Sequence, residues 1–104
     1  MGYYFVTKSS ANPTTTYPLP FPTTLAEAQS TLIQLDVLWW QSAAQSPGNT
    51  TYRNSLDAEA TAIRAQFPSA GPASGYTCNQ LVGMGSLTQS VCTQAQANGY
   101  SPTT

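Results

Sequence analysis

The chain has 104 residues, 40% of them hydrophobic, which fits one domain with a single modest core. Only 7% of the residues are Asp, Glu, Lys or Arg, against about 25% in ordinary soluble domains. The three basic residues are scattered along the chain, which argues against nucleic acid and against electrostatic binding to a membrane surface. No apolar run approaches the length of about 20 residues that a transmembrane helix needs. We therefore expect neither nucleic acid nor a membrane as a partner.

The low charge bears on solubility. The formal net charge is −1, so electrostatic repulsion between copies is weak and association is favoured. Secreted proteins, surface appendages and particle subunits tolerate this composition better than proteins of a crowded cytoplasm. The composition thus indicates a protein that contacts neighbouring molecules.

Residues 1–23 are predicted to form an extended arm. Residues 3–7 are aromatic and β-branched, which favours a strand. Further along, prolines alternate with apolar side chains, and each proline removes a backbone donor and disfavours a helix. This part of the arm is expected to be polyproline II. Its apolar residues are Tyr17, Leu19 and Phe21.

The first helix is predicted from a capping box formed by Thr24 and Glu27, and it should run to about Gln45. Its apolar positions cover an arc of roughly 200°, twice the stripe of a helix with one covered face. Leu38 lies outside this arc. The helix should therefore contact other helices, the arm or a second molecule on more than one side.

A second helix is predicted from about Thr51 to Phe67, where Pro68 ends it. One apolar stripe runs along it with spacings of three and four residues, made of Tyr52, Leu56, Ala60, Ile63 and Phe67. Arg53, Asp57 and Arg64 share one flank of that stripe. Asp57 and Glu59 fall on different sides of the helix, as solvated residues do. Residues 68–75 are expected to form a flexible loop.

The last segment contains two more capping boxes, beginning at Thr77 and Ser86, on either side of a glycine-rich break at residues 83–85. This pattern predicts short helices at about 78–83 and 87–97. Cys78 and Cys92 would lie about 21 Å apart on one straight helix, too far for a disulfide, whereas a hairpin at the break permits one. We expect the disulfide and an oxidising location. The alternative is two buried free thiols in a cytosolic protein.

The residues for catalysis are few. The chain has no His and four acidic residues, so neither a base for a Ser or Cys nucleophile nor a zinc site is easily assembled. We expect no enzyme activity, no cofactor and no metal.

Asp36 falls in the middle of the apolar arc and therefore needs a partner. Arg64 is the first candidate, ahead of Arg53 and Lys8, and a structural ion pair is favoured over a carboxylate that binds a ligand.

Trp39 and Trp40 point about 100° apart on a helix, so one should enter the core. The other packs on the arm or meets a partner, since Trp is enriched at interface hot spots. A surface for protein contacts is therefore expected from the arm and the first helix. Its residues are Tyr17, Leu19, Phe21, Leu38, Trp39 and Trp40.

These observations predict a mainly α fold: a small helical bundle of two longer helices and a disulfide-linked short helical hairpin. The helical domain spans residues 24–104, after an extended Pro-rich arm over residues 1–23.

The leading functional hypothesis is a structural or assembly protein: a subunit or minor component of a virion, surface filament or other extracellular particle. The alternative is a secreted helical binding module or effector that holds an apolar ligand or a protein partner. An arm that crosses to a neighbouring subunit favours the first hypothesis, and an arm packed on its own domain favours the second.

Overall fold

The computed structural model of the chain describes residues 16–103, and four helices make up its regular structure. They are α1 (Leu25–Gln45), α2 (Thr50–Gln66), α3 (Cys78–Gly83) and α4 (Gln89–Ala97). Within the described residues there is no strand, so the predicted mainly α fold is confirmed for this part of the chain. The strand character of residues 3–7 and the arm up to residue 15 lie outside the described residues. No helix among residues 16–103 is long and apolar enough to cross a membrane.

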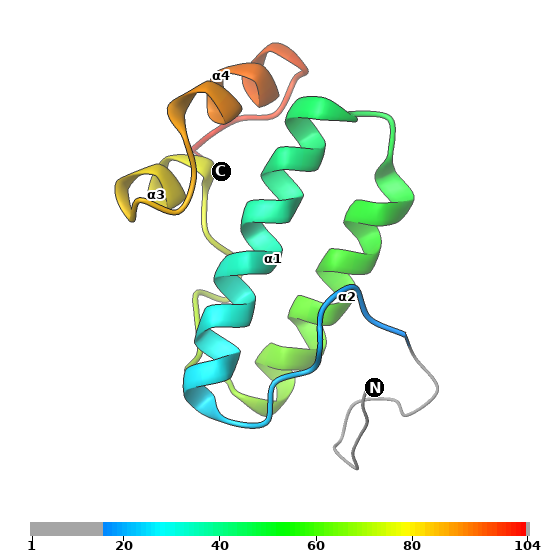
Figure 1. Cartoon of the computed structure of the whole chain (residues 1–104), viewed down its shortest axis with the longest axis vertical. Helices are drawn as coiled ribbons and strands as arrows, with labels where there is room; N and C mark the ends of the chain where they lie inside the picture. The colour runs from blue at the N-terminus through cyan, green and yellow to red at the C-terminus, as the bar shows by residue number, and fades with distance from the viewer. Residues whose placement is uncertain (1–15, 104) are drawn as a thin grey trace.

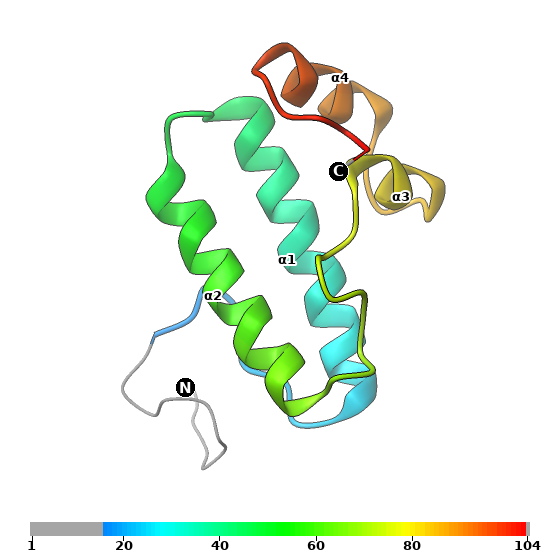
Figure 2. The same cartoon turned by 180° about the vertical axis from the view of Figure 1, so that it is seen from behind.

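Helix α1 is the longest element, and the other helices are arranged around it (Figure 1). The antiparallel helix α2 lies along one side of α1, and the short helices α3 and α4 pack against the other side. Residues 16–24 run over one face of the α1–α2 pair, as the opposite views in Figures 1 and 2 show. Because α1 has neighbours on several sides, its apolar arc can be as broad as the sequence indicates.

Two apolar clusters form the core, one on each side of α1. The cluster between α1 and α2 contains Ala28, Leu32, Leu35, Leu56, Ala60, Ile63 and Ala70. The cluster between α1 and the α3–α4 hairpin contains Trp40, Ala43, Ala44, Cys78, Leu81, Leu87, Cys92 and Ala95. The predicted stripe of the second helix thus supplies the first cluster, and the two cysteines belong to the second.

Helix α1 begins where its cap predicts. The Thr24 hydroxyl accepts a hydrogen bond from the Glu27 N–H at 3.1 Å. The Glu27 carboxylate does not return to Thr24, as a reciprocal capping box requires, but accepts from the N–H and the hydroxyl of Thr23 at 2.9 and 3.0 Å. These bonds stabilise the ionised form and lower the pKa of Glu27. The cap is therefore present, but its second half is shifted by one residue.

Helix α2 starts and ends one residue earlier than the sequence predicts. The Asn49 side chain caps it by accepting from the Tyr52 N–H at 3.2 Å. After α2, the loop expected to be flexible is anchored at several points. Ala70 is buried, and the Pro72 carbonyl accepts from the Gly75 N–H at 3.0 Å and from Arg64 Nε at 3.1 Å.

Helix α3 has the predicted bounds. The side chains of Thr77 and Gln80 form a full capping box at its start. At its end, Gly85 has a φ of 77°, the Ser86 N–H donates to the Leu81 carbonyl at 2.9 Å and the Gly85 N–H donates to the Val82 carbonyl at 3.0 Å. This pair of bonds is a Schellman motif, which satisfies carbonyls that a helix end otherwise leaves unpaired.

The predicted capping box that begins at Ser86 is wrong. Ser86 closes helix α3 through its backbone, and Leu87 turns into the core. Helix α4 therefore starts two residues later than expected, with Thr88 at the N-cap position and no side-chain hydrogen bond to the cap. It ends at Ala97, as predicted, with a second Schellman motif around Gly99.

Asn98 also joins the hairpin to α1. Its side-chain amide donates to the carbonyls of Ala43 and Ala44 at 2.9 Å each. Both carbonyls belong to the last turn of α1, where no N–H of the helix remains to pair with them. The end of α4 thus caps the end of α1.

Candidate functional site

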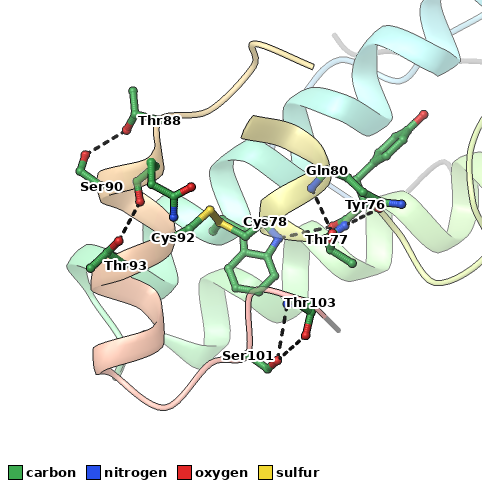
Figure 3. Close-up of a disulfide and its surroundings, with 12 residues drawn as sticks. Tyr76, Thr77, Cys78, Gln80, Thr88, Ser90, Cys92, Thr93, Ser101 and Thr103 are labelled. Carbon is green, nitrogen blue, oxygen red and sulfur yellow. Dashed lines mark hydrogen bonds between the residues drawn. A yellow bond between two sulfur atoms is a disulfide. The ribbon is translucent and has the colours of Figure 1, made fainter. Parts of the chain in front are cut away.

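Cys78 and Cys92 form the predicted disulfide across the α3–α4 hairpin, with a Cα–Cα distance of 5.7 Å (Figure 3). Both residues are fully buried, and the Trp40 indole N–H, 3.4 Å from the Tyr76 carbonyl, is directed toward the turn that enters α3. The bridge lies inside a packed core with no exposed sulfur. Its arrangement is that of a structural crosslink.

Arg53, on α2, is almost completely buried, with 3% of its surface exposed. Its guanidinium donates to the Ser42 hydroxyl, the carbonyls of Ser46 and Pro47, and the Tyr100 hydroxyl. The bonds to the Ser42 hydroxyl, the Ser46 carbonyl and the Tyr100 hydroxyl each measure 2.9 Å. No carboxylate takes part in this arrangement. Neutral oxygens hold the cation, and the fork of the guanidinium joins the α1–α2 turn to the C-terminal segment.

The two tryptophans have different surroundings. Trp40 is buried in the disulfide cluster, as expected for one of the pair. Trp39 is half-buried and meets the Tyr100 ring edge-on, with centroids 5.5 Å apart. The Arg53 guanidinium lies 5.7 Å from the Trp39 ring centre and 5.3 Å from that of Tyr100, within reach of a cation–π interaction. Trp39 therefore packs on the C-terminal segment of its own chain.

Asp36 is half-buried on α1, and its carboxylate accepts from the Tyr76 N–H at 2.8 Å. Burial raises the pKa of Asp36, whereas the Tyr76 N–H and the charge of Arg64 act in the opposite direction. A Cβ on Gly75 would lie 3.3 Å from a terminal nitrogen of Arg64 and 3.4 Å from both carboxylate oxygens of Asp36. The structure thus brings Asp36 and Arg64 together beside Gly75, with the backbone of Tyr76 as the direct hydrogen-bond donor to Asp36.

Glu59 has no exposed surface at all, which overturns the expectation that it is solvated. One carboxyl oxygen accepts from the Leu19 N–H at 2.9 Å, and the other is buried without a hydrogen-bond partner among the described residues. Burial raises the pKa of Glu59 to about 7, although the Leu19 N–H acts to lower it. Glu59 therefore accepts a proton near neutral pH, unlike an ordinary surface glutamate.

The part of the arm that the structure describes packs on its own chain. Leu19 and Phe21 contact the cluster between α1 and α2, and the rings of Tyr17 and Phe21 lie 5.5 Å apart. Leu38, expected on the far side of α1, is half-buried against the same cluster. For residues 16–23 this differs from the expectation of an arm laid along a neighbouring subunit. The side chains of Leu19 and Phe21 are partly covered by the helices that follow them in sequence.

A shallow hollow of about 230 Å³ lies where α1 and α2 meet at their connecting turn. Its lining is mostly amide, hydroxyl and aromatic: Leu38, Gln41, Ser42, Gln45, Ser46, Asn49 and Tyr52. No acidic or basic side chain lines it. Among residues 16–103 there is also no group of three or more His, Cys, Asp or Glu that could hold a metal ion.

Two of the buried polar residues were missed by sequence reasoning, although the helical period contains the signal. Glu59 follows Leu56 by three residues and precedes Ile63 by four, so it shares their face. Arg53 precedes Leu56 by three residues. The sequence pattern predicts Glu59 in solvent, and Arg53 on the flank of the stripe as a candidate partner for Asp36. The spacing of Glu59 and Arg53, taken alone, places them beside the core.

The exposed charge of the described part is very small. Of its six acidic and basic residues, Arg53 and Glu59 are buried and Asp36 and Arg64 are half-buried, which leaves Glu27 and Asp57 as the exposed ones. Most of the ionisable groups therefore lie inside or at the margin of the core, and the described surface consists mainly of neutral polar side chains.

Comparison of the chain with models of protein families, with curated proteins and with solved structures finds no match in any of the three.

Proposed function

We propose that the protein is a structural or assembly protein, a subunit or minor component of a virion, surface filament or similar extracellular particle. In this role it acts through protein–protein contacts rather than by catalysis. The observation that carries the proposal is the surface itself: Glu27 and Asp57 are the exposed charged residues of residues 16–103. A neutral polar surface offers little electrostatic resistance to close packing with other subunits.

The disulfide supports an extracellular location. Disulfides persist in oxidising compartments and are rare in the cytosol, where thiols are kept reduced. A small domain also gains from a crosslink, because a short chain buries a limited core. The buried Cys78–Cys92 bridge, which closes the α3–α4 hairpin, is therefore suited to a domain that works outside the cell.

A second candidate, the secreted binding module, has its own support. Residues 17–22 pack on the α1–α2 pair of the same chain, which is the arrangement expected of a self-contained module. The hollow beside Leu38 and Tyr52 would be the place to hold a ligand or a partner side chain. Its aromatic and amide groups offer stacking and neutral hydrogen bonds.

The molar mass in solution separates the two candidates. Light scattering after size-exclusion chromatography should give the full chain a mass that is a multiple of 11.0 kDa and rises with concentration. Replacing the exposed Gln29 and Gln34 of α1 by Glu should reduce this association, because it adds like charges to the surface. A matched variant with both residues changed to Asn keeps the surface neutral and should assemble like the wild type.

Two truncations complete the experiment. A chain without residues 1–15 keeps Leu19 and Phe21 on the core and should remain folded, so its mass shows whether those first residues take part in assembly. A chain without residues 1–23 also uncovers Glu59 and should lose stability. A full chain that stays monomeric at every concentration contradicts the assembly function and leaves the binding module as the better assignment.

A further inference from the structure

The carboxyl group of Glu59 lies beneath a segment that regular secondary structure does not hold in place. Residues 17–22, which we call the latch segment, cross the α1–α2 pair (Figure 1) and belong to no helix or strand. Leu19 and Phe21 rest on the apolar cluster below them. The Leu19 N–H donates to Glu59 at 2.9 Å. This bond joins the latch segment to the middle of α2.

Apart from the apolar packing of Leu19 and Phe21, the latch segment has few backbone donors that could attach it. Residues 18, 20 and 22 are prolines, which carry no N–H, so between residues 18 and 22 only Leu19 and Phe21 have a backbone donor. One of these two donors is used on Glu59. The prolines also restrict the free segment, so its docking loses little conformational entropy and its release gains little. The balance between docked and released states is therefore sensitive to the state of a single carboxyl group.

Among residues 16–103, no charged side chain pairs with that carboxyl group. The acidic and basic residues of the elements around it are Glu27 and Asp36 on α1 and Arg53, Asp57 and Arg64 on α2, with the phenols of Tyr17 and Tyr52 as further titratable groups. Burial and the Leu19 N–H are the two influences on the pKa of Glu59, and none of these groups is among them. The second carboxyl oxygen is buried without a hydrogen bond. An ionised Glu59 is therefore poorly stabilised while the segment covers it.

We propose that Glu59 is a proton-controlled latch: its neutral carboxyl group holds residues 17–22 against the α1–α2 pair, and its ionised form releases them. Release opens the carboxylate to water and uncovers the apolar side chains beneath Leu19 and Phe21. The packing of α1 against the α3–α4 hairpin is unaffected, because these contacts lie away from the segment. This device goes beyond assembly or binding as such and does not depend on which of them is correct.

The pH range of the switch follows from the two states of Glu59. With the segment released, the carboxyl group returns toward its ordinary pKa of 4.5, whereas with the segment docked its pKa is about 7. Between these values only the docked state holds the proton, so each unit of rising pH weakens docking by up to about tenfold. Below this range both states are neutral and above it both are ionised, so docking no longer depends on pH.

Amide hydrogen exchange of the full chain, followed by NMR, tests the latch. The protection factor of the Leu19 amide, taken relative to an unstructured peptide at each pH, should fall by about two orders of magnitude from pH 4.5 to pH 7.5. Core amides of α1, such as that of Leu35, should lose much less protection. In Glu59→Gln, where the side chain stays neutral and keeps an acceptor oxygen, the Leu19 protection factor should not change with pH.

Glu27→Gln is the matched control, because Glu27 is an exposed glutamate whose pKa is lowered rather than raised. It should keep the wild-type pH profile at Leu19. A wild-type profile that is flat in pH, or a Glu59→Gln profile that still falls, overturns the latch. So does an equal loss of protection throughout α1, which would mean that Glu59 acts on the whole fold. Should Glu59→Gln fail to fold, the wild-type profile and the carboxyl ¹³C titration of Glu59 decide alone.

Discussion

Helix α2 buries one cation and one carboxylic acid six residues apart, and it accommodates them in different ways. Hydroxyl and carbonyl oxygens and two aromatic rings surround the guanidinium of Arg53. Glu59 has one N–H donor and a second oxygen without a partner, so it becomes neutral near pH 7. The two buried groups therefore differ in hydrogen bonding: the guanidinium has several acceptors around it, whereas the carboxyl group has a single donor.

The geometry of Arg53 predicts that lysine cannot replace it. Arg53→Lys keeps the charge but loses the planar fork that contacts Ser42 and Tyr100 at once, so at least one charged hydrogen bond disappears. The free energy of unfolding should fall by about 2 kcal/mol, measured by urea denaturation. Arg64→Lys, at a half-buried position with one hydrogen bond to the Pro72 carbonyl, is the control and should change stability by less than half as much. Equal losses in both variants would show that the fork is not the important feature.

Loss of the Asp36 charge and loss of its hydrogen-bond acceptor should affect the stability of the fold differently. Asp36→Asn keeps an oxygen for the Tyr76 N–H and removes a carboxylate whose ionised form is opposed by burial, so it should change stability by less than about 1 kcal/mol. Asp36→Ala leaves that N–H without its acceptor and should lower the free energy of unfolding by about 1–3 kcal/mol.

Thermal unfolding at neutral pH measures both Asp36 variants, with Asp57→Ala as the exposed control. The pKa of Asp36 lies above its ordinary value of 3.8. Its contribution to stability is therefore complete below pH 3.8 and declines as the pH rises from there through the raised pKa. If Asp36→Ala and Asp57→Ala lower the melting temperature equally, the bond to Tyr76 contributes nothing.

At the scale of the elements, glycines at helix ends fix the shape of the disulfide hairpin. Gly85 has a φ of 77°, which L-residues adopt at a cost of about 1–2 kcal/mol, so Gly85→Ala should lower stability by about that amount. Gly83 is the last residue of α3, has an ordinary φ and has open space around its α-carbon, so Gly83→Ala should be neutral or stabilising. Chemical denaturation of the two variants makes the comparison. A loss at Gly83 as large as that at Gly85 would contradict the Schellman assignment.

Some helix bounds can be predicted from the sequence alone, and others cannot. The bounds of α1 and α3 follow from their caps and from the residues that stop them, because these signals act within one turn of the chain. The start of α4 cannot be predicted in this way, because the capping pattern at Ser86 and the end of α3 involve the same residues. Local signals that overlap cannot be ranked without the tertiary contact that buries Leu87.

Buried polar groups are the harder part of the prediction. Asp36 could be placed at the core because it lies within a broad apolar arc, whereas Glu59 and Arg53 lie beside a narrow stripe. Their burial depends on segments distant in sequence: Leu19 is 40 residues from Glu59, and Tyr100 is 47 residues from Arg53. The period of a helix reports which face is apolar. It does not report whether a segment distant in sequence also buries the residues beside that apolar face.

At the scale of the whole molecule, the disulfide and the helical architecture could be predicted, but the position of the arm could not. The Cys78–Cys92 pairing follows from one glycine-rich break between the two cysteines. The placement of residues 17–22 depends on whether their own helices or a neighbour offers the better apolar surface. Both alternatives satisfy the same sequence, and the described residues show the intramolecular one.

The protonation of Glu59 also changes the net charge of the protein. While Glu59 is neutral, the formal charge of the chain is one unit more positive, zero instead of −1. From about pH 5 to 7 the folded chain should then hardly migrate in an electric field, although its composition gives an isoelectric point of about 4.8. Salts that act by screening have little charge to screen in this range. The proposed self-association should consequently respond more to temperature and to excluded cosolutes than to ionic strength between pH 5 and 7.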